Sequence, residues 1–175
     1  MMTASSTASA GPVAGDRTAG PDGLDRAIRR VDEAVMTIRS GNPQPYIDCW
    51  ADDPDVTLFG AWGPIELGYP AVTGTFQWVG SRFTGHSGGG VENTVVYASG
   101  DLAYTVGFER GPVSVDGGPE RDMVIRVTHI YRRFGEEWML VHRHADFPPA
   151  DQRRARPGEG GQPARGHAPG PLGHE

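Results

Sequence analysis

The spacing of the apolar residues changes part-way along the chain, and this change strongly limits the possible folds. Near the N-terminal end they recur every three or four positions, on one face of a helix, at Leu24, Ala27, Ile28, Val31, Ala34, Val35 and Ile38. After the glycine-rich stretch 85–90, apolar and polar residues alternate instead, as in strands with one buried face. Helices followed by strands in this order predict an α+β domain.

The remaining elements follow from local signals. Gly41 and Pro43 end the first helix. The sequence then predicts a short helix at 46–51, a strand at 56–59 and a third helix at 68–83. Four longer strands are predicted at 92–97, 102–109, 121–133 and 138–146. Short turns join these four, so we expect hairpins and a strongly bent antiparallel sheet, with about three N-terminal helices packed on its concave face. Such packing leaves a cavity suited to a small-molecule ligand.

Composition divides the chain into three parts. All four Trp, five Tyr and six Phe lie within residues 23–149, which we interpret as one domain with a core of its own. Residues 1–22 and 150–175 are rich in Gly, Pro and small side chains. Such stretches bury too little apolar surface to offset the entropy of ordering, so we expect two disordered tails.

Charge and cysteine content exclude several classes of protein. The formal net charge is −6, whereas a nucleic-acid partner requires a basic face, so we expect none. The single cysteine, Cys49, permits no intramolecular disulfide and no thiolate metal cluster. No segment approaches the roughly 20 apolar residues that span a bilayer, and no secretory signal is evident. We therefore expect a soluble cytoplasmic protein with no membrane partner.

Three segments carry a resemblance to a known family: 56–72 (VTLFGAWGPIELGYPAV), 99–111 (SGDLAYTVGFERG) and 127–146 (VTHIYRRFGEEWMLVHRHAD). Together they resemble the SnoaL-like branch of the nuclear transport factor 2-like superfamily, which also includes the calmodulin-dependent kinase association domain and ketosteroid isomerase-like proteins. The resemblance implies a cone-shaped α+β fold and a homodimer formed across the outer sheet face. Family members include cyclases, isomerases, epoxide hydrolases, dehydratases and proteins that only bind or assemble.

The closing strand carries the densest group of polar candidates. Residues two apart in a strand share a face, so His142 and His144 point one way and Arg143 the other. With a two-residue turn at 135–136, His129 lies opposite His142, and three imidazoles gather on one face. With a bulge the register slips by one, and His129 joins Arg143 in a site for a carboxylate or enolate. A third interpretation leaves both strand-end histidines on the outer face.

A metal site is the weakest of these readings, because catalytic zinc needs three protein ligands and no cysteine joins the histidines. We predict no metal and no organic cofactor.

Trp62 and Glu66 follow the first strand, at the expected cavity mouth. Trp62 would be a pocket wall, and Glu66, if surrounded by apolar groups, a general base; a solvated loop carboxylate is the plainer reading of Glu66.

Ketosteroid isomerase-like chemistry would need an acid on the short second helix, for which Asp48 is the candidate. It would also need a buried oxyanion donor, for which Tyr46, Tyr104 and Tyr131 are available. Tyrosines on an amphipathic sheet are more often core residues.

Two functional hypotheses result. The first is a cofactor-independent lyase, cyclase, isomerase or hydrolase acting on a small carbonyl or carboxylate compound. His129 or Glu66 would move a proton, while Arg143 or Arg126 stabilises developing negative charge. The residues expected to bind the ligand are Trp62, Tyr104, Arg126, Tyr131, His142, Arg143 and His144. The second hypothesis is a non-catalytic ligand-binding or dimerisation domain.

Overall fold

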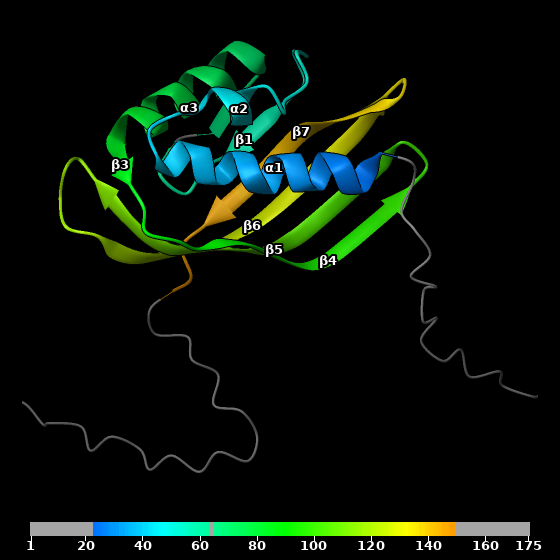
Figure 1. The fold of residues 1–175 in the computed structure, drawn as a ribbon. Helices are drawn as coiled ribbons and strands as arrows, with labels where there is room; N and C mark the ends of the chain where they lie inside the picture. The colour runs from blue at the N-terminus through cyan, green and yellow to red at the C-terminus, as the bar shows by residue number, and fades with distance from the viewer. Residues whose placement is uncertain (1–22, 64, 150–175) are drawn as a thin grey trace, which may run out of the picture.

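The computed structural model describes residues 23–63 and 65–149, which form one bent sheet with helices on its concave side (Figure 1). The helices are α1 (Leu24–Arg39), α2 (Gln44–Ile47) and α3 (Tyr69–Arg82). The strands are β1 (Thr57–Phe59), β2 (Ile65–Leu67), β3 (Phe83–Gly85), β4 (Gly90–Ser99), β5 (Leu102–Val115), β6 (Arg121–Phe134) and β7 (Glu137–Asp146). The α+β class and the three predicted helices ahead of the long strands are confirmed; the two predicted tails lie outside the described residues.

Helix α1 lies across the concave face of the sheet (Figure 1). Every apolar position of its predicted face is buried, which confirms the periodicity. Gly41 ends the helix in the left-handed region, with φ at 83°, where a side chain would be strained. A Cβ there would also lie 3.2 Å from the carbonyl oxygen of Phe83. Glycine therefore allows the chain to turn sharply beneath β3.

The sheet has seven strands in the order β2-β1-β7-β6-β5-β3, with β4 also paired to β5. All pairings are antiparallel except that of β1 with β7, which is parallel. The wholly antiparallel expectation was therefore wrong at this one edge. The intervening meander is long enough to return the chain in the same direction, as a parallel pair requires. Strands β2 and β3 were not predicted; β2 lies in the segment read as a loop after the first strand, and β3 begins at Phe83, where the third helix was expected to end.

A bulge in the closing hairpin decides which side chains of β7 face the interior. Next to the turn, Phe134 pairs with Glu137 across a two-residue loop. The register then shifts between Tyr131 and Ile130, which pair with Leu140 and His142 and leave Val141 without a partner residue. The inward residues of β7 before and after this shift are Trp138, Leu140, Arg143 and Ala145. The extra residue thus brings Arg143, rather than His142, to the concave face.

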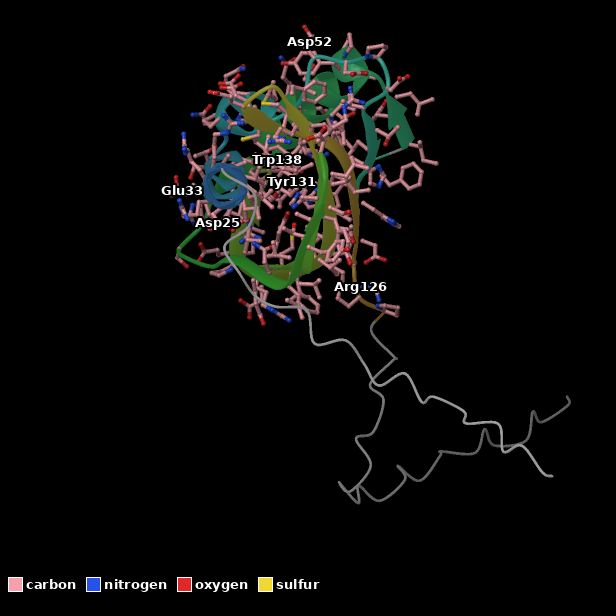
Figure 2. The ribbon with its side chains drawn as sticks, turned by 90° about the vertical axis from the view of Figure 1, so that its right-hand side faces the viewer. Asp25, Glu33, Asp52, Arg126, Tyr131 and Trp138 are labelled. Atoms are coloured by element: carbon pink, nitrogen blue, oxygen red, sulfur yellow. The ribbon has the colours of Figure 1, made fainter. Side chains whose placement is uncertain are left out.

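Side chains fill the space between α1 and the sheet. In Figure 2, Tyr131 and Trp138 lie inside, while Asp25, Glu33 and Arg126 lie at the surface.

Within the described residues, no helix combines the length and apolar character needed to cross a membrane.

Candidate functional site

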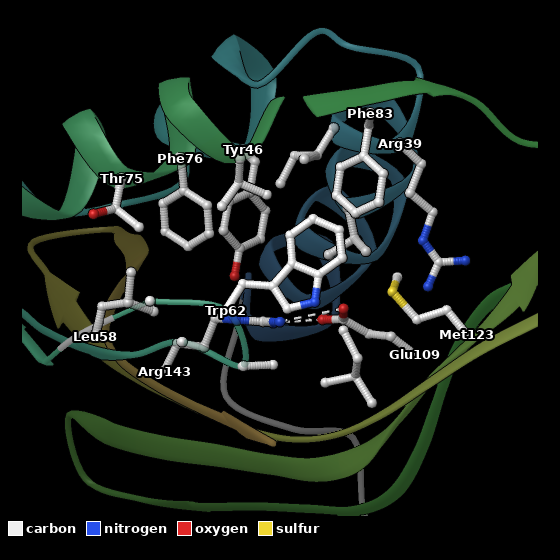
Figure 3. Close-up of a pocket in the computed structure, with 17 residues that line it drawn as sticks. Arg39, Tyr46, Leu58, Trp62, Thr75, Phe76, Phe83, Glu109, Met123 and Arg143 are labelled. Atoms are coloured by element: carbon white, nitrogen blue, oxygen red, sulfur yellow. Dashed lines mark hydrogen bonds and ion pairs between the residues drawn. The ribbon is translucent and has the colours of Figure 1, made fainter. Parts of the chain in front are cut away.

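A small cavity lies between the helices and the sheet at the end where α3 packs (Figure 3). The volume that the centre of a water molecule can reach inside it is about 70 Å³. This is enough for a few waters or a small organic group. Its walls are mainly apolar and include Trp62 and Phe83, which stack on each other with ring centroids 5.1 Å apart. Five polar side chains reach the cavity from three helices and two strands, namely Arg39, Tyr46, Thr75, Glu109 and Arg143. The combination of apolar walls with a few convergent polar groups is typical of a ligand site.

The floor of the cavity holds a buried ion pair between Arg143 of β7 and Glu109 of β5 (Figure 3). Arg143 Nη1 and Nη2 donate to the two carboxylate oxygens, the second over 3.2 Å. Burial alone would raise the pKa of Glu109, but the adjacent Arg143 holds it below its ordinary value. Conversely, burial would lower the pKa of Arg143, and Glu109 raises it. Both groups are therefore ionised at neutral pH.

His129 of β6 lies behind this pair and is fully buried. It faces Arg143 across the β6–β7 ladder, and its Nε2 is 3.0 Å from Arg143 Nη1. Guanidinium nitrogens can only donate, so Nε2 is the acceptor and Nδ1 carries the proton. Burial, reinforced by the positive charge of Arg143, lowers the pKa of His129 to about 3. The imidazole is therefore neutral.

Tyr46 of α2 connects the histidine to the cavity. Its hydroxyl is 3.0 Å from His129 Nε2, and its ring packs edge-on against Phe76 of α3. Burial raises the pKa of Tyr46, so the phenol keeps its proton. Because Nε2 is an acceptor, the Tyr46 hydroxyl donates its one hydrogen bond to the imidazole.

Arg39 is a second buried cation, in the last turn of α1, with only 1% of its surface exposed. Its Nη1 donates to the carbonyl oxygen of Arg110 over 2.9 Å, and Nη2 has no partner among the described residues. The approach depends on Gly111, because a Cβ there would lie 3.0 Å from Nη1. Burial lowers the pKa of Arg39, yet an arginine remains charged at neutral pH.

These groups leave the cavity with excess positive charge. Two buried guanidiniums, Arg39 and Arg143, face one carboxylate, Glu109, while His129 and Tyr46 are neutral. The sum is one unbalanced positive charge in a low-dielectric site, where it interacts more strongly than in water. An organic anion of matching size would supply the missing negative charge. Within the described part of the chain, no group of three or more His, Cys, Asp or Glu side chains is placed to hold a metal ion.

The sequence-predicted residues of the interior are only partly brought together. Trp62 and Arg143 line the cavity, whereas His129 and Tyr131 are buried beside it and do not form its wall. Glu66 is half-buried on β2 and accepts a hydrogen bond of 2.7 Å from Thr75, which itself faces the cavity. Glu66 is thus one side chain removed from the site.

Four other predicted ligand contacts lie on the opposite, outer face of the sheet. His142 is 2.6 Å from the Thr57 hydroxyl, and exposed His144 packs beside Phe59. The other two are Tyr104, which packs against Tyr97, and Arg126, which pairs with Asp146. These four do not contribute to the cavity, because the bulge and the alternation of the strands point them outward. Asp48 is also exposed and bonds Gln44, so it does not reach into the cone.

A family model described as the SnoaL-like domain matches residues 29–150. The chain belongs to the SnoaL-like family. No curated protein matches it. Similar solved structures show the nuclear transport factor 2-like fold of this SnoaL-like domain.

Three of them illustrate the likeness. A nuclear transport factor 2-like protein of unknown function from Pseudomonas putida is 25% identical, with 76% of this chain and 90% of that chain covered and a TM-score of 0.59. A ketosteroid isomerase-like protein from Erwinia carotovora is 15% identical (71% and 92% covered, TM-score 0.59). A protein of unknown function in nutrient uptake from Rhodospirillum rubrum is 21% identical (73% and 100% covered, TM-score 0.56).

Two charged residues of the SnoaL-like cavity were not predicted from the sequence. Glu109 belongs to the alternating set Ala103, Thr105 and Gly107 of β5, so parity alone places it on the inner face. Arg39 follows Ile38 and Val35 on the buried side of α1, but a terminal arginine is ordinarily taken for a solvated residue. In both cases the sequence shows a charged residue at a position whose spacing matches the buried face of its helix or strand.

Proposed function

We propose that this SnoaL-like domain binds a small organic anion with an apolar body, as a carboxylate or as the enolate of a carbonyl compound. Arg39 is the observation that carries the proposal, since it is buried in the cavity wall with a free donor, Nη2, and no counter-charge of its own. The anionic group would bind there, and the apolar body would contact Trp62 and Phe83.

The test is a binding panel of small aliphatic and aromatic carboxylates, measured by calorimetry on wild type and Arg39→Met. A hydrogen bond to a charged group contributes about 1.5–3 kcal/mol, so the variant should lose roughly 10- to 100-fold in affinity. Arg126→Met is the matched control, because Arg126 lies on the outer face and its loss should leave affinity unchanged. Binding that survives Arg39→Met, or that fails for every carboxylate, contradicts the proposal.

The same geometry supports catalysis without an organic cofactor. Glu109 would take a proton from the carbon next to a carbonyl, the C–H electron pair would pass to the carbonyl oxygen, and Arg39 and Arg143 would hold the resulting enolate. Hydrogen–deuterium exchange into bound ketones, followed by NMR, tests this step. Arg39→Met should slow the exchange by 10-fold or more, since it removes one oxyanion donor. Exchange at the uncatalysed rate in wild type would leave a binding function alone.

The second proposal is a homodimer formed through the outer sheet face. The cytoplasm is the compartment that we propose for it. That face exposes apolar side chains from neighbouring strands, including Tyr97 and Leu102, which are 56% and 53% exposed. Large exposed apolar patches are typical of protein interfaces. Light scattering should give the mass of a dimer for the full chain and of a monomer for Tyr97→Glu. A wild-type monomer at high concentration would exclude this assembly.

A further inference from the structure

A shallow groove runs over the outside of α3, next to the cavity, and is called here the α3 groove. Trp78 forms one of its walls and is 45% exposed, so a large aromatic surface is left in contact with water. Exposed apolar surface of this kind is typical of ligand-binding grooves and protein interfaces. The residues that line the groove, none of them charged, are Trp62, Pro70, Ala71, Gly74, Thr75 and Trp78.

The α3 groove and the cavity have two lining residues in common, Trp62 and Thr75. In Figure 3, Thr75 lies at the end of the cavity opposite Arg39, and Trp62 lies between them. The groove therefore begins at the end of the cavity that is away from Arg39. A ligand that fills the cavity with its anionic group on Arg39 has its other end directed toward Thr75 and the groove.

The cavity is too small to enclose a long ligand. The volume that the centre of a water molecule can reach is about 70 Å³, so a longer apolar chain has to leave the cavity. The α3 groove offers that chain a surface on which it is partly shielded from water, which is favourable in proportion to the area covered. Gly74 leaves room for it, because a Cβ there would meet nothing within 4 Å.

The Trp78 wall of the groove is held from outside. The guanidinium of Arg82 lies 5.4 Å from the centroid of the Trp78 ring, a cation–π contact. Arg82 in turn forms an ion pair with Asp116, which follows β5. Neither Arg82 nor Asp116 lines the groove. The aromatic wall is therefore positioned before a ligand binds, which lowers the entropic cost of binding, and its support adds no charge to the groove.

We propose that the cavity and the α3 groove together bind a straight-chain carboxylate with a long apolar tail, whose tail lies in the groove between Trp62 and Trp78. This inference rests on the proposed anion site at Arg39 and names the class of ligand that the site takes. Trp62 contacts the chain where it leaves the cavity, and the open surface at Gly74 admits the part beyond it. Short carboxylates occupy the cavity alone and gain nothing from the groove.

Calorimetry on the full chain with carboxylates from propanoate to decanoate tests the proposal. Affinity should rise by about 2- to 4-fold for each methylene that enters the groove. Gly74→Leu places a branched side chain in the groove, so it should remove this gain and leave the affinity for propanoate as in wild type. Gln77→Leu is the matched control, because Gln77 is exposed on the same helix and does not line the groove.

The outcomes separate this inference from the anion site on which it rests. If propanoate binds through Arg39 and decanoate binds no more tightly, the groove is not part of the site and the inference is overturned. Equal losses of decanoate affinity in Gly74→Leu and Gln77→Leu overturn it as well. If neither propanoate nor decanoate binds, the anion site is contradicted, and the inference with it.

NMR with ¹⁵N-labelled tryptophan gives an independent measurement, should Gly74→Leu fail to fold. Decanoate should shift the indole N–H signals of Trp62 and Trp78, whereas propanoate should leave that of Trp78 in place. Trp138, buried beside the start of α1, is the internal control and should not move. An unmoved Trp78 signal at saturating decanoate overturns the proposal. So does a fall in mass by light scattering in Gly74→Leu, since a second copy of this chain would then occupy the groove.

Discussion

Replacement of Glu109 by Gln tests the electrostatic balance of the cavity most directly. The substitution keeps the shape of the side chain and removes the carboxylate charge that, among the described residues, faces Arg143. Glu109 and Arg143 are 3% and 7% exposed, so the remaining cation is left unpaired in a low-dielectric site. Breaking a buried pair in this way costs about 3–5 kcal/mol. That is a large fraction of the ~5–15 kcal/mol that stabilises a typical domain.

The assay is chemical denaturation at neutral pH, accompanied by a thermal scan. For a domain of this size the loss corresponds to a fall in melting temperature of roughly 10–20 °C. Glu92→Gln is the matched control, because Glu92 forms an exposed ion pair with Arg110 at 3.3 Å between neighbouring strands. Exposed pairs contribute about 0–1 kcal/mol, so this variant should remain close to wild type.

A double variant, Glu109→Leu with Arg143→Met, separates charge from packing. Replacing both partners by apolar groups is often neutral, so most of the lost stability should return. Equal small losses in Glu109→Gln and Glu92→Gln would refute the claim that the cavity floor is a buried ion pair. A double variant less stable than Glu109→Gln would show that the pair is stabilising in itself.

Three further predictions concern single positions. The pKa of His129 is lowered in the folded state to about 3 from the ordinary value of 6.5. The stability contributed by the neutral, buried imidazole is therefore complete above pH 6.5 and is lost as the pH falls toward 3. His129→Gln should flatten this part of a pH–stability curve. Gly107→Ala should destabilise the protein by about 1–3 kcal/mol, because its Cβ would lie 2.0 Å from the carbonyl oxygen of Glu92. Gly74→Ala, where the Cβ would meet open space on α3, should stabilise it by ~0.5–1 kcal/mol. Urea titrations measure both changes. Cys49 is buried and burial raises the pKa of its thiol, so a thiol reagent should label it only in denaturant; rapid labelling of the native protein would contradict its placement.

Periodicity was sufficient for the long elements and insufficient for the short ones. The face of α1 and the strands β4 to β7 were predicted because each repeats its pattern over at least two turns or several alternations. The edge formed by β1 and β2 was incompletely predicted, since pairing with β7 is a long-range choice. The residues within a short strand do not determine which distant strand it pairs with.

The candidate site shows the same limit at the level of single side chains. Trp62 was expected at the cavity from the resemblance, and Arg143 only under the bulged alternative; both line the cavity. His142 and Arg143 could not be told apart in advance, because a change of one residue in register exchanges their faces. Glu109 was accessible from strand parity, but its importance depends on Arg143 arriving opposite it from another strand.

The extra residue at Val141 also affects how this strand is compared across relatives. An alignment that runs through β7 without a gap would equate inward positions of an unbulged relative with His142 instead of Arg143. Apparent exchanges between histidine and arginine would then reflect a missing insertion and not altered chemistry. Homologues should be aligned separately on each side of Val141, so that residues are matched by the face they occupy.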